Sequence, residues 1–119
     1  MRVEKLPLSE SVKGAPILVD AFSTPGTLVH RVPDSAAIID TVHLWAFNTD
    51  GVTPSATFEF GSSSVTFESP TLQLNPVKVI DGLVLEGGKD IRFYDGSGAL
   101  SIAVVGYVLR IYKDQEGVV

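Results

Sequence analysis

Prolines and turn-forming clusters divide this chain into short segments, and their spacing constrains the fold more than any other feature. Seven prolines lie between residues 7 and 76, and each removes a backbone donor and disfavours helix. Turn-forming clusters recur at 23–26, 32–35, 48–51, 61–64, 86–90 and 94–98. The runs between them are rich in Val, Ile, Thr and Phe, which is typical of short antiparallel strands. We therefore expect an all-β sandwich of jelly-roll or Greek-key type, with about eight strands.

The length of 119 residues indicates one domain. We expect an extended N-terminal arm over 1–14, because this segment is polar, then a sandwich domain over 15–113 and a C-terminal tail over 114–119. The expected strands are 17–22, 27–32, 41–48, 55–60, 64–68, 77–80, 83–85, 90–94 and 99–111. A turn at 48–51, with Gly51 at a positive φ, is expected to form a hairpin connection between 41–48 and 55–60.

The composition excludes several classes of protein. The chain has no cysteine, so disulfides and thiolate metal sites are ruled out. Its net charge is -5 and its nine basic residues are scattered, which argues against nucleic-acid binding through phosphates. No apolar run reaches the roughly 18 residues of a membrane helix, and charged residues and Pro7 interrupt any signal-peptide core. We expect a protein made in a cytoplasm, without membrane or nucleic-acid partners.

Period-two alternation predicts which side chains of the half-buried strands face the core. In 55–60, Phe58 and Phe60 share one face, and Ser55, Thr57 and Glu59 share the other. In 64–68, Phe67 is expected to point inward as well. Each of these strands should therefore have one buried face and one face exposed to solvent.

Two predicted strands are apolar on both faces. In 41–47 the residues Val42, Leu44 and Ala46 alternate with His43, Trp45 and Phe47, and the strand at 99–111 repeats this pattern. A sandwich strand normally exposes one face to water, so the second apolar face must be covered by the arm, by a loop or by another subunit. The expected interface residues are His43, Trp45, Phe47, Val105, Tyr107 and Leu109.

The sequence contains no nucleophile elbow, EF-hand loop or Walker loop, so we expect no enzyme and no cofactor. The two histidines, His30 and His43, lie in predicted strands and could be neighbours across strands. A metal site would need Asp20 or Asp40 beside them, and hydrogen-bonded strand histidines are the favoured interpretation. Asp40 and Asp81 could form a glycosidase-like pair only within a cleft, which a short chain with few long loops hardly offers.

Three segments resemble small virion proteins of tailed bacteriophages: VHLWAFNTDGVTPSATFEFG, VIDGLVLEGGKDIRFYDG and LSIAVVGYVLRI. The resemblance covers residues 38–112 and is a pattern of strands and turns, without a catalytic signature. The matching positions are Val42, Leu44, Ala46, Asn48, Gly61, Leu83, Leu85, Gly88, Ile91, Val105, Gly106, Tyr107, Arg110 and Ile111.

This resemblance implies a structural component of the virion, namely a head decoration protein or, as the less favoured alternative, a neck or tail piece. Its partners would be further copies of itself and other virion proteins such as a major capsid protein. An alternative is a carbohydrate-binding sandwich that uses Trp45, Phe47 or Tyr94 as a stacking platform. A small enzyme is the least favoured hypothesis.

Overall fold

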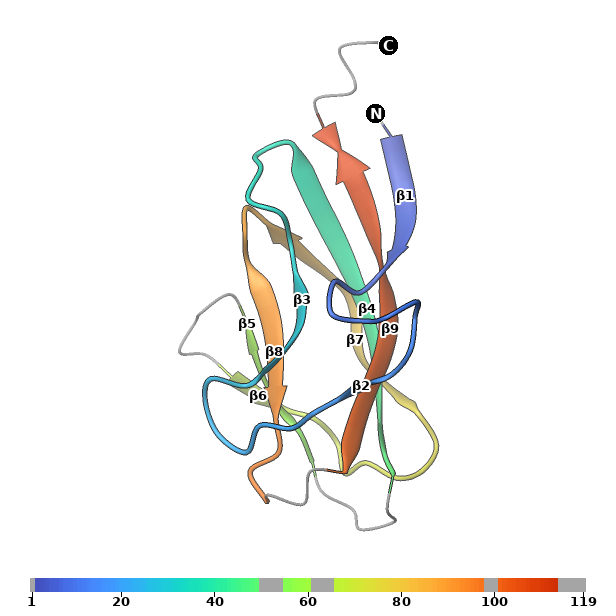
Figure 1. Ribbon diagram of the computed structural model, residues 1–119, viewed down its shortest axis with the longest axis vertical. Coiled ribbons are helices and arrows are strands. Elements are labelled where there is room, and N and C mark those ends of the chain that lie inside the picture. The colour runs from blue at the N-terminus through green and yellow to red at the C-terminus, as the bar shows by residue number, and fades with distance from the viewer. Residues whose placement is uncertain (1, 50–54, 61–65, 98–100, 114–119) are drawn as a thin grey trace.

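Two antiparallel β-sheets packed face to face form the molecule in the computed structural model, which describes residues 2–49, 55–60, 66–97 and 101–113 (Figure 1). The first sheet has the order β1 (Arg2–Pro7), β9 (Ile102–Tyr112), β4 (Ile38–Asn48) and β7 (Val77–Glu86), and β2 (Ile17–Leu18) also pairs with β9. The second sheet has the order β3 (Thr27–Arg31), β8 (Asp90–Tyr94), β5 (Thr57–Phe60) and β6 (Thr66–Glu68). The described residues contain no helix, and the predicted all-β sandwich is confirmed.

The strand β7 corrects one prediction. The segments 77–80 and 83–85 were expected as two strands, but they form one strand that pairs with β4 over its length. Gly82 has a φ of +85°, and the register with β4 shifts nearby, between Val42 and His43. The residues Asp81 and Gly82, which are typical of a turn, therefore form an irregularity within a continuous strand. Glycine suits this position because it adopts a positive φ without strain.

The N-terminal segment begins with a strand that no sequence pattern indicated. β1 is antiparallel to β9, from Arg2 opposite Tyr112 to Pro7 opposite Tyr107. The segment 1–14 was expected to be extended, and its residues 2–7 extend along the edge of the chain's own first sheet (Figure 1). The expected tail at 114–119 and Gly51 of the expected hairpin connection lie outside the described residues.

The core lies between β4 and β9 on one side and the second sheet on the other. Val42, Leu44 and Ala46 of β4 are fully buried, as are Ile91 and Phe93 of β8. The predicted inward positions of Phe58 and Phe60 are consistent with this arrangement, since Phe58 is buried and Phe60 packs against the core.

Phe67 was expected to face the core, and it does lie on the same face as buried Phe58, its direct partner across β5 and β6, but it is not itself buried. Its side chain is 53% exposed because β6 is the edge strand of the second sheet. It packs instead on its neighbours in the sheet, with ring centroids 5.9 Å from Phe58 and 5.4 Å from Phe60.

Candidate functional site

The first sheet has a face that points away from the second sheet, and we call it the outer face. Strand register defines it, because side chains of directly paired residues lie on the same face of a sheet. Trp45 is opposite Val105, His43 is opposite Tyr107, and Thr41 is opposite Leu109. The outer face consists of Val3, Lys5, Pro7, Leu18, Ile39, Thr41, His43, Trp45, Phe47, Lys78, Asp81, Val84, Glu86, Ala103, Val105, Tyr107, Leu109 and Ile111.

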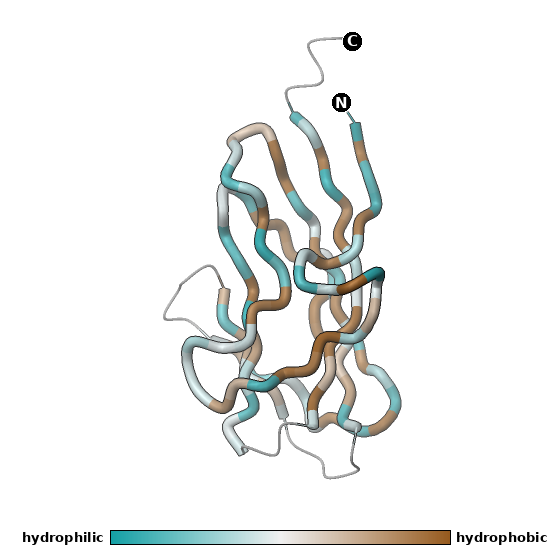
Figure 2. The backbone as a smooth tube through the Cα atoms, viewed as in Figure 1, coloured by the Kyte–Doolittle hydropathy of each residue, from teal (hydrophilic) through white to brown (hydrophobic). Residues whose placement is uncertain are grey.

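All six interface residues predicted from the sequence lie on this outer face, and the structure brings them together. The rings of His43 and Tyr107 are stacked with centroids 4.9 Å apart, and Trp45 lies 6.1 Å from Tyr107. Val105, Leu109 and Phe47 continue the apolar surface along β9 and β4, and all six side chains are half-buried. Figure 2 shows the alternating hydrophobic segments along these central strands.

The rings of His43, Trp45 and Tyr107 form what we call the aromatic strip. Lysines cover parts of its rings on both sides. The Nζ atom of Lys5 lies 4.3 Å from the Tyr107 ring centroid, and Nζ of Lys78 lies 4.8 Å from that of Trp45. Lys78 is also 2.8 Å from Asp81, and this hydrogen bond lowers the pKa of the Asp81 carboxyl. The aliphatic stems of lysines can cover apolar surface while their charges stay in water. The aromatic strip is therefore flanked by two lysines, of which Lys78 is already paired with a carboxylate.

The outer face remains open to solvent around its margins. Val3 is 53% exposed, Leu18 is 54% exposed and Val84 is 55% exposed. These residues come from three different strands that surround β4 and β9. A partner could therefore contact the outer face without unfolding any part of the sandwich.

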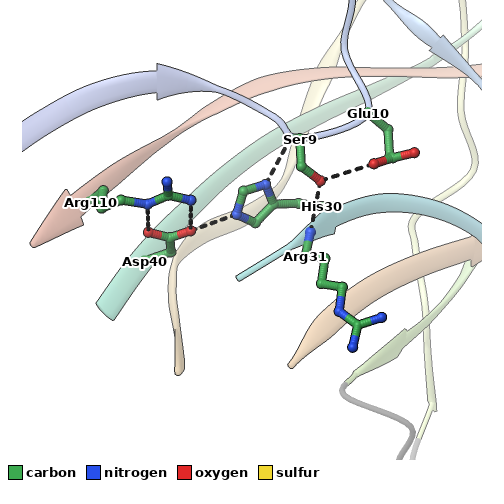
Figure 3. A network of polar contacts seen from close by, with 6 residues as sticks. All are labelled: Ser9, Glu10, His30, Arg31, Asp40 and Arg110. Carbon is green, nitrogen blue, oxygen red and sulfur yellow. Dashed lines mark hydrogen bonds and ion pairs between the residues drawn. The ribbon is translucent and has the colours of Figure 1, made fainter. Parts of the chain in front are cut away.

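A second notable cluster lies between the two sheets, where Asp40 accepts hydrogen bonds from two strands (Figure 3). Nε and an Nη atom of Arg110 lie 2.8 and 2.9 Å from its two carboxylate oxygens, and His30 Nε2 lies 2.7 Å from Oδ2. Burial raises the pKa of Asp40, but the hydrogen bonds from Arg110 and His30 outweigh it and hold this pKa below its ordinary value. The same bond to Asp40 raises the pKa of Arg110.

Sequence reasoning missed this cluster because its members are distant in the chain. It considered His30 beside His43, and that pairing is wrong, since His30 lies between the sheets and His43 lies on the outer face. The reason is that β3 and β4 belong to different sheets. Among the described residues, no group of three or more His, Asp or Glu side chains is arranged to hold a metal ion.

The His30–Asp40 pair cannot act as a general base in this arrangement. Both side chains have no exposed surface, and Nδ1 of His30 accepts the backbone N–H of Ser9 at 2.9 Å. A substrate proton would need direct access to that nitrogen or access through one water. The cluster instead joins β3, β4 and β9 with the segment that follows β1.

Asp40 and Asp81 do not form a carboxylate pair, which agrees with the sequence interpretation that disfavoured one. Asp40 is buried between the sheets, whereas the Asp81 side chain is 77% exposed on the edge strand β7. Tyr94, the third residue of the proposed sugar platform, ends β8 in the second sheet and not on the outer face. The platform could therefore consist only of the residues on β4 and β9.

An open groove of about 390 Å³ lies between β7 and the β5–β6 edge. Its lining is almost entirely apolar, and Asp81 supplies the charged side chain. It is lined by Phe58, Phe60, Phe67, Val79, Ile80, Asp81, Gly82 and Leu83. Such a lining lacks the convergent polar groups that orient a small ligand.

The fold and the outer face define an antiparallel β-sandwich with an apolar, lysine-flanked sheet surface. Comparison of the chain with protein-family models, with curated proteins and with solved structures gives no significant match. The part of the chain that the structure describes includes no helix of the length and hydrophobicity needed to cross a membrane.

Proposed function

We propose that this chain is a structural protein of a tailed-bacteriophage particle, a capsid decoration protein that acts through protein–protein contacts. The observation that carries this proposal is the outer face, where the aromatic strip around Trp45 and Tyr107 lies on strands whose inner sides already form the core. The virion resemblance of residues 38–112 agrees with a role of this kind. The binding partners would be neighbouring copies of the chain and the major capsid protein.

Exposing the apolar part of the outer face to water costs free energy. Contiguous apolar patches are rare on monomers and are typical of interaction sites. Burial of apolar surface contributes roughly 25 cal/mol per Å². Repeated copies on a particle would convert modest single contacts into stable attachment. Lys5, over the Tyr107 ring, favours a partner that places a carboxylate beside the apolar centre, whereas Lys78 is already paired with Asp81.

Light scattering after size exclusion, over about a hundredfold concentration range, tests whether the outer face mediates self-association. The wild-type chain should form a discrete oligomer. The double variant Leu18→Glu/Val84→Glu adds charge at two exposed outer-face positions and should shift the mass toward the monomer. Phe22→Glu changes a side chain that is 65% exposed and outside the outer face, and it should leave the mass unchanged.

Cosedimentation with virions produced from the genome that encodes the chain tests the particle assignment. The wild-type protein should sediment with the particles, and the Leu18→Glu/Val84→Glu variant should remain in the supernatant. A wild-type chain that stays monomeric over the whole range and does not bind the particles would overturn the proposal.

The aromatic strip also suggests the second candidate, a carbohydrate-binding module. Against it, Lys78 lies over the Trp45 ring, where a sugar would have to stack. Glycan-affinity measurements separate the two functions. In a carbohydrate-binding module, Trp45→Ala should abolish retention of the protein on a glycan column while circular dichroism stays native-like. In a capsid decoration protein, the wild-type chain should not be retained at all.

A further inference from the structure

The hydrogen bonds of His30 fix where its ring proton lies. The backbone N–H of Ser9 points at Nδ1 from 2.9 Å, and a backbone N–H can only donate. Nδ1 must therefore carry a lone pair, which places the proton of the neutral ring on Nε2. From there it is donated to Asp40, whose Oδ2 is 2.7 Å away (Figure 3). This arrangement uses both ring nitrogens of a neutral histidine.

A second proton on His30 would disrupt this arrangement in two ways. It would replace the acceptor at Nδ1 with a donor that faces the N–H donor of Ser9. It would also add a positive charge between the sheets, where the Asp40 carboxylate already forms a two-pronged ion pair with Arg110. One buried carboxylate would then have to compensate two cations.

The other charged groups near His30 have their own contacts. Glu10 accepts a hydrogen bond from the Ser9 hydroxyl, and its carboxylate points away from the imidazole in Figure 3, as does the Arg31 guanidinium. Asp90 of β8 is paired with Arg31 of β3, and its carboxylate lies 3.3 Å from Nε of Arg92. Glu4 of β1, opposite Arg110, accepts a hydrogen bond from the Tyr112 hydroxyl. Among the described residues, these contacts offer Nδ1 no replacement acceptor.

The N-terminal segment is fastened to the second sheet at Glu10, whose backbone N–H donates to the Val29 carbonyl oxygen at 3.4 Å, and at Ser9. The Ser9 hydroxyl accepts the backbone N–H of Arg31 at 2.9 Å, while its own N–H reaches His30. The preceding residue, Leu8, is only 1% exposed and belongs to the core. β1 itself has a strand partner on one side only, which is β9. The loss of the contact between Ser9 and His30 would therefore leave the segment Arg2–Glu10 with fewer bonds to the second sheet.

We propose that His30 is a proton-operated latch on this N-terminal segment. When His30 is neutral, it holds Ser9 and keeps β1 on the edge of β9. When His30 is protonated, it releases Ser9, and the segment Arg2–Glu10 opens more often. This inference concerns the space between the sheets and does not depend on the role of the outer face.

Hydrogen exchange of the full-length chain at about pH 7.5 and pH 5, corrected for intrinsic rates, tests the latch, because histidine changes charge in this range. Protection of the amides from residue 2 to residue 10 should fall about tenfold at the lower pH, whereas amides that link β4 to β7 should keep their protection. Asp40 stays ionised at both pH values because its pKa is lowered. Equal protection of the N-terminal segment at the two pH values would overturn the proposal.

Two variants assign the effect to the ring. In His30→Asn an amide oxygen can take the place of Nδ1 as acceptor but cannot be protonated, so the pH dependence should disappear. His43→Gln removes the other histidine of the chain and should leave the pH dependence intact. A pH dependence that persists in His30→Asn, or that is lost in His43→Gln, contradicts the latch.

A direct measurement covers the case in which His30→Asn does not fold. The ¹⁵N chemical shifts of the wild-type imidazole report which ring nitrogen carries the proton. At about pH 7.5 they should show His30 with its proton on Nε2. A proton on Nδ1 would exclude the latch.

Discussion

Gly106 of β9 and His43 of β4 approach each other so closely that a Cβ atom added to Gly106 would lie 2.1 Å from the carbonyl oxygen of His43. The glycine is paired with Leu44 in the middle of the longest strand pair of the first sheet. Glycine usually weakens a strand, and a common reason for its presence there is a close backbone approach. Here it allows β9 to pack tightly on β4.

The change Gly106→Ala should therefore destabilise the protein by about 3 kcal/mol, because the obstructing atom belongs to the backbone and cannot rotate away. Denaturation in guanidinium chloride measures this loss. Gly96→Ala is the matched control, since no atom lies within 4 Å of the corresponding Cβ position. If the two variants were equally stable, β9 and β4 would not pack this closely in solution.

The Asp40–Arg110 pair predicts a large effect of a nearly isosteric change. Asp40→Asn removes the charge that balances a largely buried guanidinium, and it should lower the free energy of unfolding by about 3–5 kcal/mol. Urea denaturation at neutral pH measures this change. Asp81→Asn breaks the exposed pair with Lys78 and should have little effect, because water screens that pair. Equal losses in the two variants would contradict a special role for the buried pair.

The lowered pKa of Asp40 also predicts the stability of the protein in acid. A carboxyl with a lower pKa in the folded state adds stability that is fully present above its unfolded pKa of 3.8, and this stability is lost as the pH falls through the folded value. The wild-type free energy of unfolding should therefore fall steeply below pH 3.8, and the fall should be smaller in Asp40→Asn. Denaturant titrations from about pH 7 to pH 2 would reveal parallel curves for the two proteins if this account were wrong.

The aromatic strip of the outer face predicts a graded effect at Tyr107. Tyr107→Leu removes the stack on His43 and the contact with Lys5, and it should cost about 1–2 kcal/mol. Tyr107→Phe keeps the ring, so its thermal midpoint should stay near that of the wild type. An equal loss in both variants would mean that the hydroxyl, not the ring, stabilises this face.

Local patterns in the sequence were sufficient to predict the sandwich and its central strands. The alternation in 55–60 indicated a half-buried strand, and the alternation in 41–47 indicated a strand with a second apolar face. β1 was not predicted because Arg2–Pro7 combines charged residues with a proline, and its pairing with β9 spans nearly the whole chain. β7 was divided in two because Asp81-Gly82 is as typical of a turn as of an irregular strand.

The candidate sites also differ in whether neighbouring residues in the sequence or contacts between distant segments define them. The outer-face residues could be named from strand alternation alone, because one strand places His43, Trp45 and Phe47 on the same side. In the cluster of His30, Asp40 and Arg110, His30 contacts Asp40 from the other sheet, and Arg110, on the neighbouring strand, follows Asp40 by 70 positions. No spacing rule predicts such a contact, since it depends on which strands share a sheet.

The position of β9 has a consequence for how the protein is made. Among the described strands it is the last to leave the ribosome, yet β1, β2 and β4 all pair with it. Until residues 102–112 emerge, β1 and β2 have no partner strand and β4 is paired only with β7. The nascent chain must therefore hold several apolar segments unpaired, and these favour aggregation. Assembly of the first sheet can finish only once nearly all of the described chain has been translated.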